Sequence, residues 1–226
     1  DTVLINALTS PSTDAGNDIN LCINDSIQLQ ASGADDYLWT PNTFLSASNI
    51  FNPWAIPTVN TTYILTGSLA NGCTKNDTIS IDVNPLPVLT TSSDAVICEG
   101  DTIQIEVFGG NSFNWLTANN ISNSTVSNPQ VWPNTTTTYR VLAADTNTCA
   151  DTAEITITVN PKPTVNAGLD QDICFGDSTS LNASGNAISY NWSNWITNGV
   201  LFESIITQDY ILTGTGINNC DNQDTV

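Results

Sequence analysis

Apolar side chains alternate with polar ones along several stretches of the chain. Ile27, Leu29 and Ala31 are separated by glutamines, and residues 79–83 and 103–107 show the same period of two. An extended strand with this period buries one face and exposes the other. Clusters of Gly, Asn and Pro interrupt the stretches at short intervals, and no segment has the 3.6-residue period of a helix. The pattern therefore predicts an all-β fold.

The same arrangement of residues recurs along the chain. Cys22, Cys98 and Cys174 are evenly spaced, and Cys73 and Cys149 are separated by the same interval. Tryptophans and tyrosines follow this period too, for example Trp39 with Trp115 and Tyr63 with Tyr139. Because unrelated residue types keep one period, we divide the chain into three repeats, residues 11–86, 87–162 and 163–226.

The repeats meet at two proline-rich joints, VNPLP at 83–87 and VNPKP at 159–163. Alternating prolines favour extended backbone, so each joint is a short, semi-rigid spacer. The third repeat lacks its last strand, and the first ten residues, DTVLINALTS, match that strand. We therefore expect residues 1–10 to be the last strand of a preceding repeat. They would complete a sandwich upstream, in the same polypeptide or in a neighbouring chain.

Each repeat has the length and pattern of an immunoglobulin-like β-sandwich. About 76 residues with six to eight short strands and a central tryptophan are typical of that fold. The sequence predicts tandem immunoglobulin-like domains in a linear array, with Trp39, Trp115 and Trp192 in the cores. A second aromatic set is expected to complete the cores, or alternatively to pack at interfaces: Trp54, Trp132 and Trp195.

Two cysteines per repeat predict disulfides, because a small sandwich buries a limited core. Pairing within each repeat is the simplest scheme: Cys22–Cys73, Cys98–Cys149 and Cys174–Cys220. In a standard sandwich, however, the two positions lie at opposite ends. Pairing between neighbouring repeats, Cys22–Cys149 and Cys98–Cys220, is therefore the alternative. Both schemes predict an oxidising, extracellular compartment.

Several phrases recur in the repeats: Cys-x-Gly-Asp at 98–101 and 174–177, Thr-Thr-Tyr at 61–63 and 137–139, and the closing Val-Asn-Pro. They resemble the PKD-like and Ig-like tandem repeats of giant adhesins and filament proteins on bacterial surfaces. Those proteins leave the cell by type IX secretion, and their repeats serve mainly as stalks and adhesive arrays. The resemblance implies a secreted protein at the cell surface.

The charge balance excludes several partners. The net charge is −19, and the cationic side chains are Lys75, Arg140 and Lys162. Nucleic acids and anionic lipid surfaces need clustered Lys and Arg, so neither is an expected partner. A membrane-spanning helix needs at least about 18 consecutive apolar residues. Because the chain has no apolar run of that length, direct membrane insertion is not expected.

An acidic chain also attracts divalent cations, and repeated aspartates are candidate calcium ligands. Asp18, Asp94 and Asp170 each precede the first cysteine of a repeat by four residues, and Asp14 and Asp172 lie nearby. The favoured alternative is that these side chains cap turns through local hydrogen bonds. No other cofactor is expected.

Asp followed by Ser or Thr and then a small or apolar residue occurs repeatedly. The motif resembles the O-glycosylation signal of the same bacterial group, which implies these acceptors: Thr2, Ser26, Thr78, Thr102, Thr152 and Thr225. The alternative is that Asp-Ser and Asp-Thr open strands.

The chain contains no histidine, and its aspartates recur in every repeat, whereas an active site normally occurs once. We therefore predict that it is not an enzyme. The predicted function is a structural segment of an extracellular fibre or stalk, contacting neighbouring repeats and bundling laterally with other copies. The alternative is an adhesive module that binds glycans or another cell surface.

Overall fold

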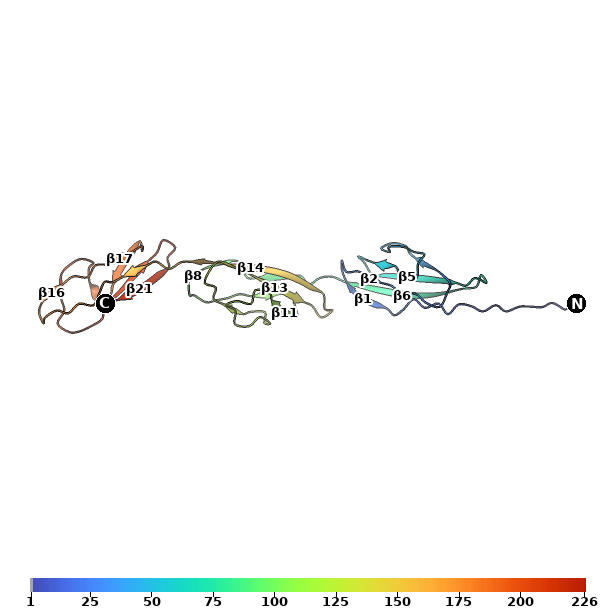
Figure 1. Ribbon diagram of the computed structural model, residues 1–226, viewed down its shortest axis with the longest axis horizontal. Helices are drawn as coiled ribbons and strands as arrows, with labels where there is room; N and C mark the ends of the chain where they lie inside the picture. The colour runs from blue at the N-terminus through green and yellow to red at the C-terminus, as the bar shows by residue number, and fades with distance from the viewer. Residues whose placement is uncertain (1) are drawn as a thin grey trace. The chain divides into compact units, whose positions relative to one another are not determined.

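The computed structural model describes residues 2–226, which form β-strands, turns and one short 3-10 helix at Ser193–Trp195 (Figure 1). The contacts group the chain into two compact units. One contains residues 1–88 with 109–111 and 143–151, and the other contains 89–108, 112–142 and 152–226. Within the described part of the chain, no helix is long and apolar enough to cross a membrane.

The first repeat is a sandwich of two sheets. Its larger sheet has the order β1 (Ile19–Cys22), β6 (Thr74–Asn84), β5 (Thr61–Ser68), β3 (Asp36–Thr40). In this sheet β1 runs parallel to β6, while β5 is antiparallel to both β6 and β3. The second layer contains β2 (Ile27–Gln28), paired with β4 (Trp54–Ala55).

The second repeat has the same design. Its larger sheet has the order β11 (Ser112–Trp115), β13 (Thr137–Ala144), β14 (Ala150–Asn160), β8 (Ala95–Cys98), and β8 is parallel to β14 (Figure 1). The other layer pairs β9 (Ile103–Gln104) with β12 (Gln130–Val131), and β7 (Thr90–Thr91) with β10 (Val107–Phe108).

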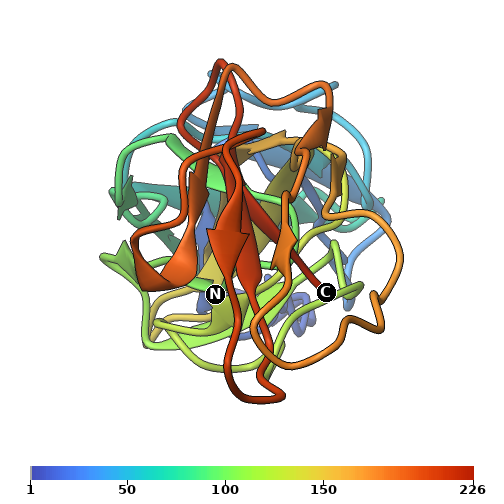
Figure 2. The ribbon, with the colours of Figure 1, turned by 90° about the vertical axis from the view of Figure 1, so that its left-hand side faces the viewer.

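The third repeat keeps most of these strands, and they face the viewer in Figure 2. Its larger sheet has the order β18 (Ser189–Trp192), β20 (Ile211–Thr215), β21 (Asp221–Thr225). The other pairs join β15 (Val165–Asn166) to β17 (Ser184–Gly185), and β16 (Ser178–Thr179) to β19 (Phe202–Glu203). Residues 171–174, which correspond to β1 and β8, form no strand.

Two facing sheets of antiparallel strands around a central tryptophan define immunoglobulin-like sandwiches. The additional parallel pairing of the first strand with the last aligns Ile19 with Ile81, and Ala95 with Ile157. The all-β, immunoglobulin-like prediction is confirmed. The division at 11–86, 87–162 and 163–226 stays a prediction.

Each sandwich has its own hydrophobic cluster around one tryptophan. Trp39, Trp115 and Trp192 are 0%, 1% and 4% exposed, so their predicted core role is confirmed. The indole N–H of Trp39 donates to the Ile50 carbonyl and that of Trp115 to the Val126 carbonyl, each at 2.9 Å. These bonds satisfy the one polar group that each ring carries into the core.

The second set of tryptophans lies at the surface, so their expected core position was wrong. Trp54, Trp132 and Trp195 are 49%, 39% and 100% exposed. Trp54 precedes the fully buried Ala55 on β4, and Trp132 follows the fully buried Val131. Alternation along a strand gives the inward positions to Ala55 and Val131 and turns both rings outward.

The amino-terminal segment has no strand partner. Residues 2–10 are not part of any strand, and residue 1 lies outside the described residues. Val3, Leu4 and Ile5 are each 86% exposed. The segment contacts the first repeat where the Asn71 side-chain amide donates to the Thr9 carbonyl at 3.0 Å. Its assignment as the last strand of a preceding repeat stays a prediction.

Candidate functional sites: inter-repeat disulfides and an open groove

The disulfides join consecutive repeats. Cys22 is bonded to Cys149, and Cys98 to Cys220, with Cα–Cα distances of 5.5 and 5.6 Å. The preferred scheme within each repeat, Cys22–Cys73, Cys98–Cys149 and Cys174–Cys220, was wrong. The structure has the alternative scheme.

The geometry of the last strand explains this pairing. Cys22 lies beside Asn84 at the end of β6, whereas Cys73 directly precedes Thr74 at its beginning. A strand of 11 residues is about 36 Å long, at roughly 3.3 Å per residue. A disulfide needs Cα atoms less than about 7 Å apart. The two cysteines of one repeat are therefore out of reach of each other.

Two cysteines remain as thiols in residues 2–226, the half-buried Cys73 and the exposed Cys174. Cys174 occupies the repeat position of Cys22 and Cys98, while Cys73 occupies that of Cys149 and Cys220. In both observed bridges, the first cysteine of one repeat is bonded to the second cysteine of the next. Cys174 and Cys73 are the two positions of this pattern that have no partner among residues 2–226.

Two of the candidate calcium ligands accept backbone hydrogen bonds from the last strand of their repeat. Asp18 Oδ1 accepts from the Ser80 N–H, and Asp94 Oδ1 from the Thr156 N–H, each at 2.8 Å. Each carboxylate thus joins the segment before the first strand to the last strand of the same repeat. Asp170 occupies the same repeat position, but the residue equivalent to Thr156 lies beyond Val226.

The other two calcium candidates are also separate. Asp14 Oδ1 accepts from the Gly16 N–H at 2.9 Å, and Asp172 is exposed in the third repeat. Among residues 2–226, His, Cys, Asp and Glu side chains nowhere form a group of three that could hold a metal ion. The structure therefore does not bring the five aspartates into one site.

The candidate glycan acceptors are mostly accessible. Thr152 is half-buried and accepts from the Arg140 guanidinium at 3.3 Å, whereas the others are exposed: Thr2, Ser26, Thr78, Thr102 and Thr225. Their modification stays a prediction.

The preceding aspartates have a structural role in two of these motifs. Asp77 accepts from the Ala15 N–H and Asp224 from the Ala167 N–H, each at 2.8 Å. The backbone hydrogen bond from Ala15 is the main cause that lowers the pKa of Asp77, followed by that from Thr78. These bonds hold the last strand against the segment that opens the repeat.

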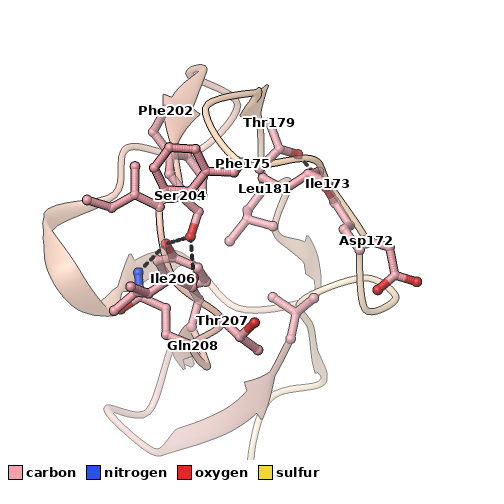
Figure 3. Close-up of a pocket in the computed structure, with 14 residues that line it drawn as sticks. Asp172, Ile173, Phe175, Thr179, Leu181, Phe202, Ser204, Ile206, Thr207 and Gln208 are labelled. Atoms are coloured by element: carbon pink, nitrogen blue, oxygen red, sulfur yellow. Dashed lines mark hydrogen bonds between the residues drawn. The ribbon is translucent and has the colours of Figure 1, made fainter.

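A groove of about 310 Å³ opens in the third repeat (Figure 3). One wall is residues 171–173 with Phe175, and the other is residues 204–208. Leu181 points into the space between them in the figure, and Phe202, Tyr210 and Val226 complete the lining. The ring of Phe202 meets the edge of Tyr210, with centroids 5.2 Å apart.

The groove lies where the second repeat has the end of its last strand. In the second repeat Ile157–Asn160 of β14 pair with Ala95–Cys98, and Ile157 is fully buried. Val226 corresponds to Ile155, and positions equivalent to 156–160 are outside the sequence. The missing strand was predicted from the alignment of the repeats, whereas the groove beside it was not.

The chain was compared with known proteins. No protein-family profile and no curated protein matches it. Among solved structures it resembles the I67–I69 fragment of the titin I-band, at 9% identity and a TM-score of 0.45, covering 97% of this chain and 98% of that one.

Two further similar structures consist of immunoglobulin domains. The first eight immunoglobulin domains of DSCAM match at 14% identity and a TM-score of 0.40, over 96% of this chain and 41% of that one. Domains 1–5 of Sidekick-1 match at 11% identity and a TM-score of 0.34, over 96% of this chain and 58% of that one. At these scores the immunoglobulin-like assignment rests on the strand order described above.

Proposed function

We propose that this chain is a load-bearing structural segment of an extracellular surface fibre or stalk, built from the three repeats. The disulfides that join consecutive repeats carry this proposal. A bridge inside one repeat would stabilise that repeat alone. A bridge between repeats also ties one repeat to the next and limits how far the chain extends under force.

The two bridges enclose overlapping parts of the chain. Residues 22–149 lie within the first bridge and residues 98–220 within the second, so residues 98–149 are common to both. When the ends are pulled apart, the force passes through the first bridge to Cys149, along the common segment to Cys98, and through the second bridge to Cys220. Only the common segment and the two tails, residues 1–22 and 220–226, can therefore be stretched to their full length.

Single-molecule force spectroscopy tests the proposal. At about 3.5 Å per residue, the oxidised chain reaches roughly 28 nm when all three repeats unfold, compared with roughly 80 nm after reduction. A Cys22→Ser/Cys149→Ser variant retains the Cys98–Cys220 bridge and is the matched control. It should reach an intermediate length of roughly 37 nm. Equal lengths before and after reduction would refute the load-bearing role.

The cellular setting of the proposal is the cell surface of a bacterium with type IX secretion. Disulfides persist in oxidising, extracellular compartments, which supports secretion. The phrases CEGD, CFGD and VNP support the PKD-like repeat family. As a stalk segment the chain has no catalytic role. Lateral bundling with other copies is part of the proposal, because the sheets have unpaired edges at β1, β3, β8 and β11.

A second candidate function is glycan binding around Trp195. This ring is fully exposed, and a second, shallower hollow beside it also contains Asn194, Glu203 and Gln208. Exposed indoles beside amide and carboxylate groups are suited to sugar rings, which stack on aromatic faces. Binding on a glycan array that Trp195→Ala abolishes and Trp54→Ala preserves would support this function.

A further inference from the structure

We propose that small thiols open the inter-repeat disulfides by attack on one sulfur only, that of Cys22 in the first bridge and that of Cys98 in the second. These two residues are then the sites of mixed-disulfide modification, while Cys149 and Cys220 are released as sheltered thiols that close the bridge again. The inference goes beyond the load-bearing role and does not depend on it, because it concerns exchange with a soluble thiol in the absence of force.

The two cysteines of each bridge differ in exposure. Cys149 and Cys220 are 0% and 1% exposed, whereas Cys22 and Cys98 are half-buried. Thiol–disulfide exchange begins when a thiolate approaches one sulfur from the side opposite to the S–S bond, so it needs access to that sulfur. A sulfur without exposed surface is not attacked in the folded chain. The first cysteine of each bridge is therefore the one that a thiol reaches.

The local backbone explains why the first cysteine is accessible. Cys22 and Cys98 are the last residues of β1 and β8, and each is followed by a turn. In each turn, the N–H of the residue three positions on donates to the cysteine carbonyl at 3.0 Å. Residues 24–26 and 99–102 are exposed, so the segment that follows each cysteine does not cover it.

The second cysteine of each bridge is fixed by its surroundings. The Asp145 N–H donates to the Cys149 carbonyl, and the Cys149 N–H donates to Asp145 Oδ1, each at 2.9 Å. In the second bridge, Cys220 Sγ lies 3.9 Å from the Asn160 carbonyl oxygen. Asn160 is the residue opposite Cys98 in the parallel pair of β8 and β14. A Cys220 thiol released by exchange therefore has a hydrogen-bond acceptor directly beside Cys98.

With glutathione as the thiol, its thiolate attacks Cys98 Sγ, and a glutathione–Cys98 disulfide forms as the Cys98–Cys220 bond breaks. The electron pair leaves on Cys220 Sγ, which takes a proton from water. In the reverse step the Cys220 thiolate attacks Cys98 Sγ and releases glutathione. Complete reduction needs a second glutathione thiolate, which attacks the glutathione sulfur of the adduct and releases the Cys98 thiolate and oxidised glutathione. The same steps apply to Cys22 and Cys149.

The charge around the bridges selects the class of thiol. Acidic side chains lie within four residues of the cysteines in both bridges: Asp25, Asp145 and Asp151 in the first, and Glu99, Asp101 and Asp221 in the second. Lys162 brings a positive charge near the second bridge, where a Cβ at Gly100 would lie 3.7 Å from its Nζ. The net charge of both surroundings is negative. A small cationic thiol such as cysteamine is therefore favoured over glutathione, which is anionic.

Peptide mapping of trapped adducts tests the direction of attack. A Cys73→Ser/Cys174→Ser chain leaves only the bridged cysteines. After brief treatment with glutathione, acid quenching and alkylation, the first cysteines of the bridges should carry at least about ten times more glutathione than the second ones. In guanidinium chloride both cysteines of each bridge should be modified. An equal distribution in the folded chain would overturn the proposal, as would the absence of adducts under conditions that modify the unfolded chain.

A matched pair of single variants in the same chain measures the shelter of the second cysteine. Cys98→Ser leaves Cys220 as a thiol, Cys220→Ser leaves Cys98, and both lack the second bridge. With cystamine, the disulfide of cysteamine, the Cys98 thiol should react at least about ten times faster than the Cys220 thiol. The ratio should approach one in guanidinium chloride. Equal rates in the folded chains would overturn the sheltered position of Cys220.

A comparison of two thiols tests the preference for positive charge. At about 0.01 M salt and equal thiolate concentrations, cysteamine should form its adduct on Cys22 several-fold faster than glutathione does. The ratio of the two rates should fall as the salt concentration is raised, because salt screens the acidic side chains. A ratio that does not change with salt would overturn the preference for a cationic thiol.

Discussion

The second and third repeats share one design but differ at one edge. In the second repeat, residues 95–98 form β8 against the end of β14, and Ile157 fills the core between the sheets. In the third, residues 171–174, Gln-Asp-Ile-Cys, share only Ile-Cys with residues 95–98 and form no strand, and a groove of about 310 Å³ lies beside them. A short edge segment forms a strand where a neighbouring strand satisfies its backbone hydrogen bonds.

The largest expected effect comes from the central tryptophans. Trp115→Ala should destabilise the second repeat by about 3–5 kcal/mol, because it empties a closed core and removes the bond to Val126. Trp192→Ala should cost less, since the third core is already open at the groove. Hydrogen exchange of the β13 and β20 amides measures the two effects separately. Equal losses would mean that the open edge does not weaken the third core.

Removing the bridge between these two repeats should have the next largest effect. The Cys98→Ser/Cys220→Ser double variant should lower the free energy of unfolding by about 2–4 kcal/mol, because the bridge closes a long loop of the unfolded chain. Replacing Cys174 by Ser should leave the stability of the monomer unchanged. Denaturant unfolding of both variants, monitored by tryptophan fluorescence, checks the difference.

Replacing the aspartates that precede the first strands should change the stability by a smaller amount. Asp94→Ala removes the acceptor of the Thr156 N–H and should destabilise the second repeat by about 1 kcal/mol. Asp170→Ala removes a carboxylate that has no equivalent donor within the chain, so the monomer should be unaffected. Faster exchange of the Thr156 amide in the first variant is the expected signature. A loss in both variants would show that Asp170 has another role.

The smallest effect concerns pH in the first repeat. Hydrogen bonding lowers the pKa of Asp77 in the folded chain, chiefly through the Ala15 N–H. Its contribution to stability is therefore present above the unfolded pKa and is lost as the pH falls below about 4. Asp77→Asn should flatten the acid branch of the stability curve of this repeat. The second repeat has Ala153 at this position and should lack the contribution.

Much of the fold could be predicted from the sequence. The alternation of apolar residues and the even spacing of the cysteines indicated the sandwiches, and the core positions of Trp39, Trp115 and Trp192 followed from the fold. Trp54 and Trp132 were misplaced, because composition does not reveal which side of a short strand faces inward. The neighbouring Ala55 and Val131 show that small and branched residues take those places.

The sites were less predictable. Spacing alone could not decide the disulfides, because the choice depends on the length of β6 between Cys73 and Cys22. Three of the calcium candidates, Asp18, Asp94 and Asp170, are equivalent in sequence. This equivalence reflects a repeated hydrogen bond to the last strand, as Asp18 and Asp94 show. The groove depends on a strand that lies outside the sequence, so only the folded neighbours of that strand reveal it.

The pairing of cysteines between consecutive repeats has a consequence for how such a protein gains or loses repeats. Because every bridge belongs to two repeats, deleting or duplicating one whole internal repeat leaves each remaining first cysteine facing the second cysteine of its new neighbour. Recombination between repeats therefore preserves the pairing of cysteines at the new junction.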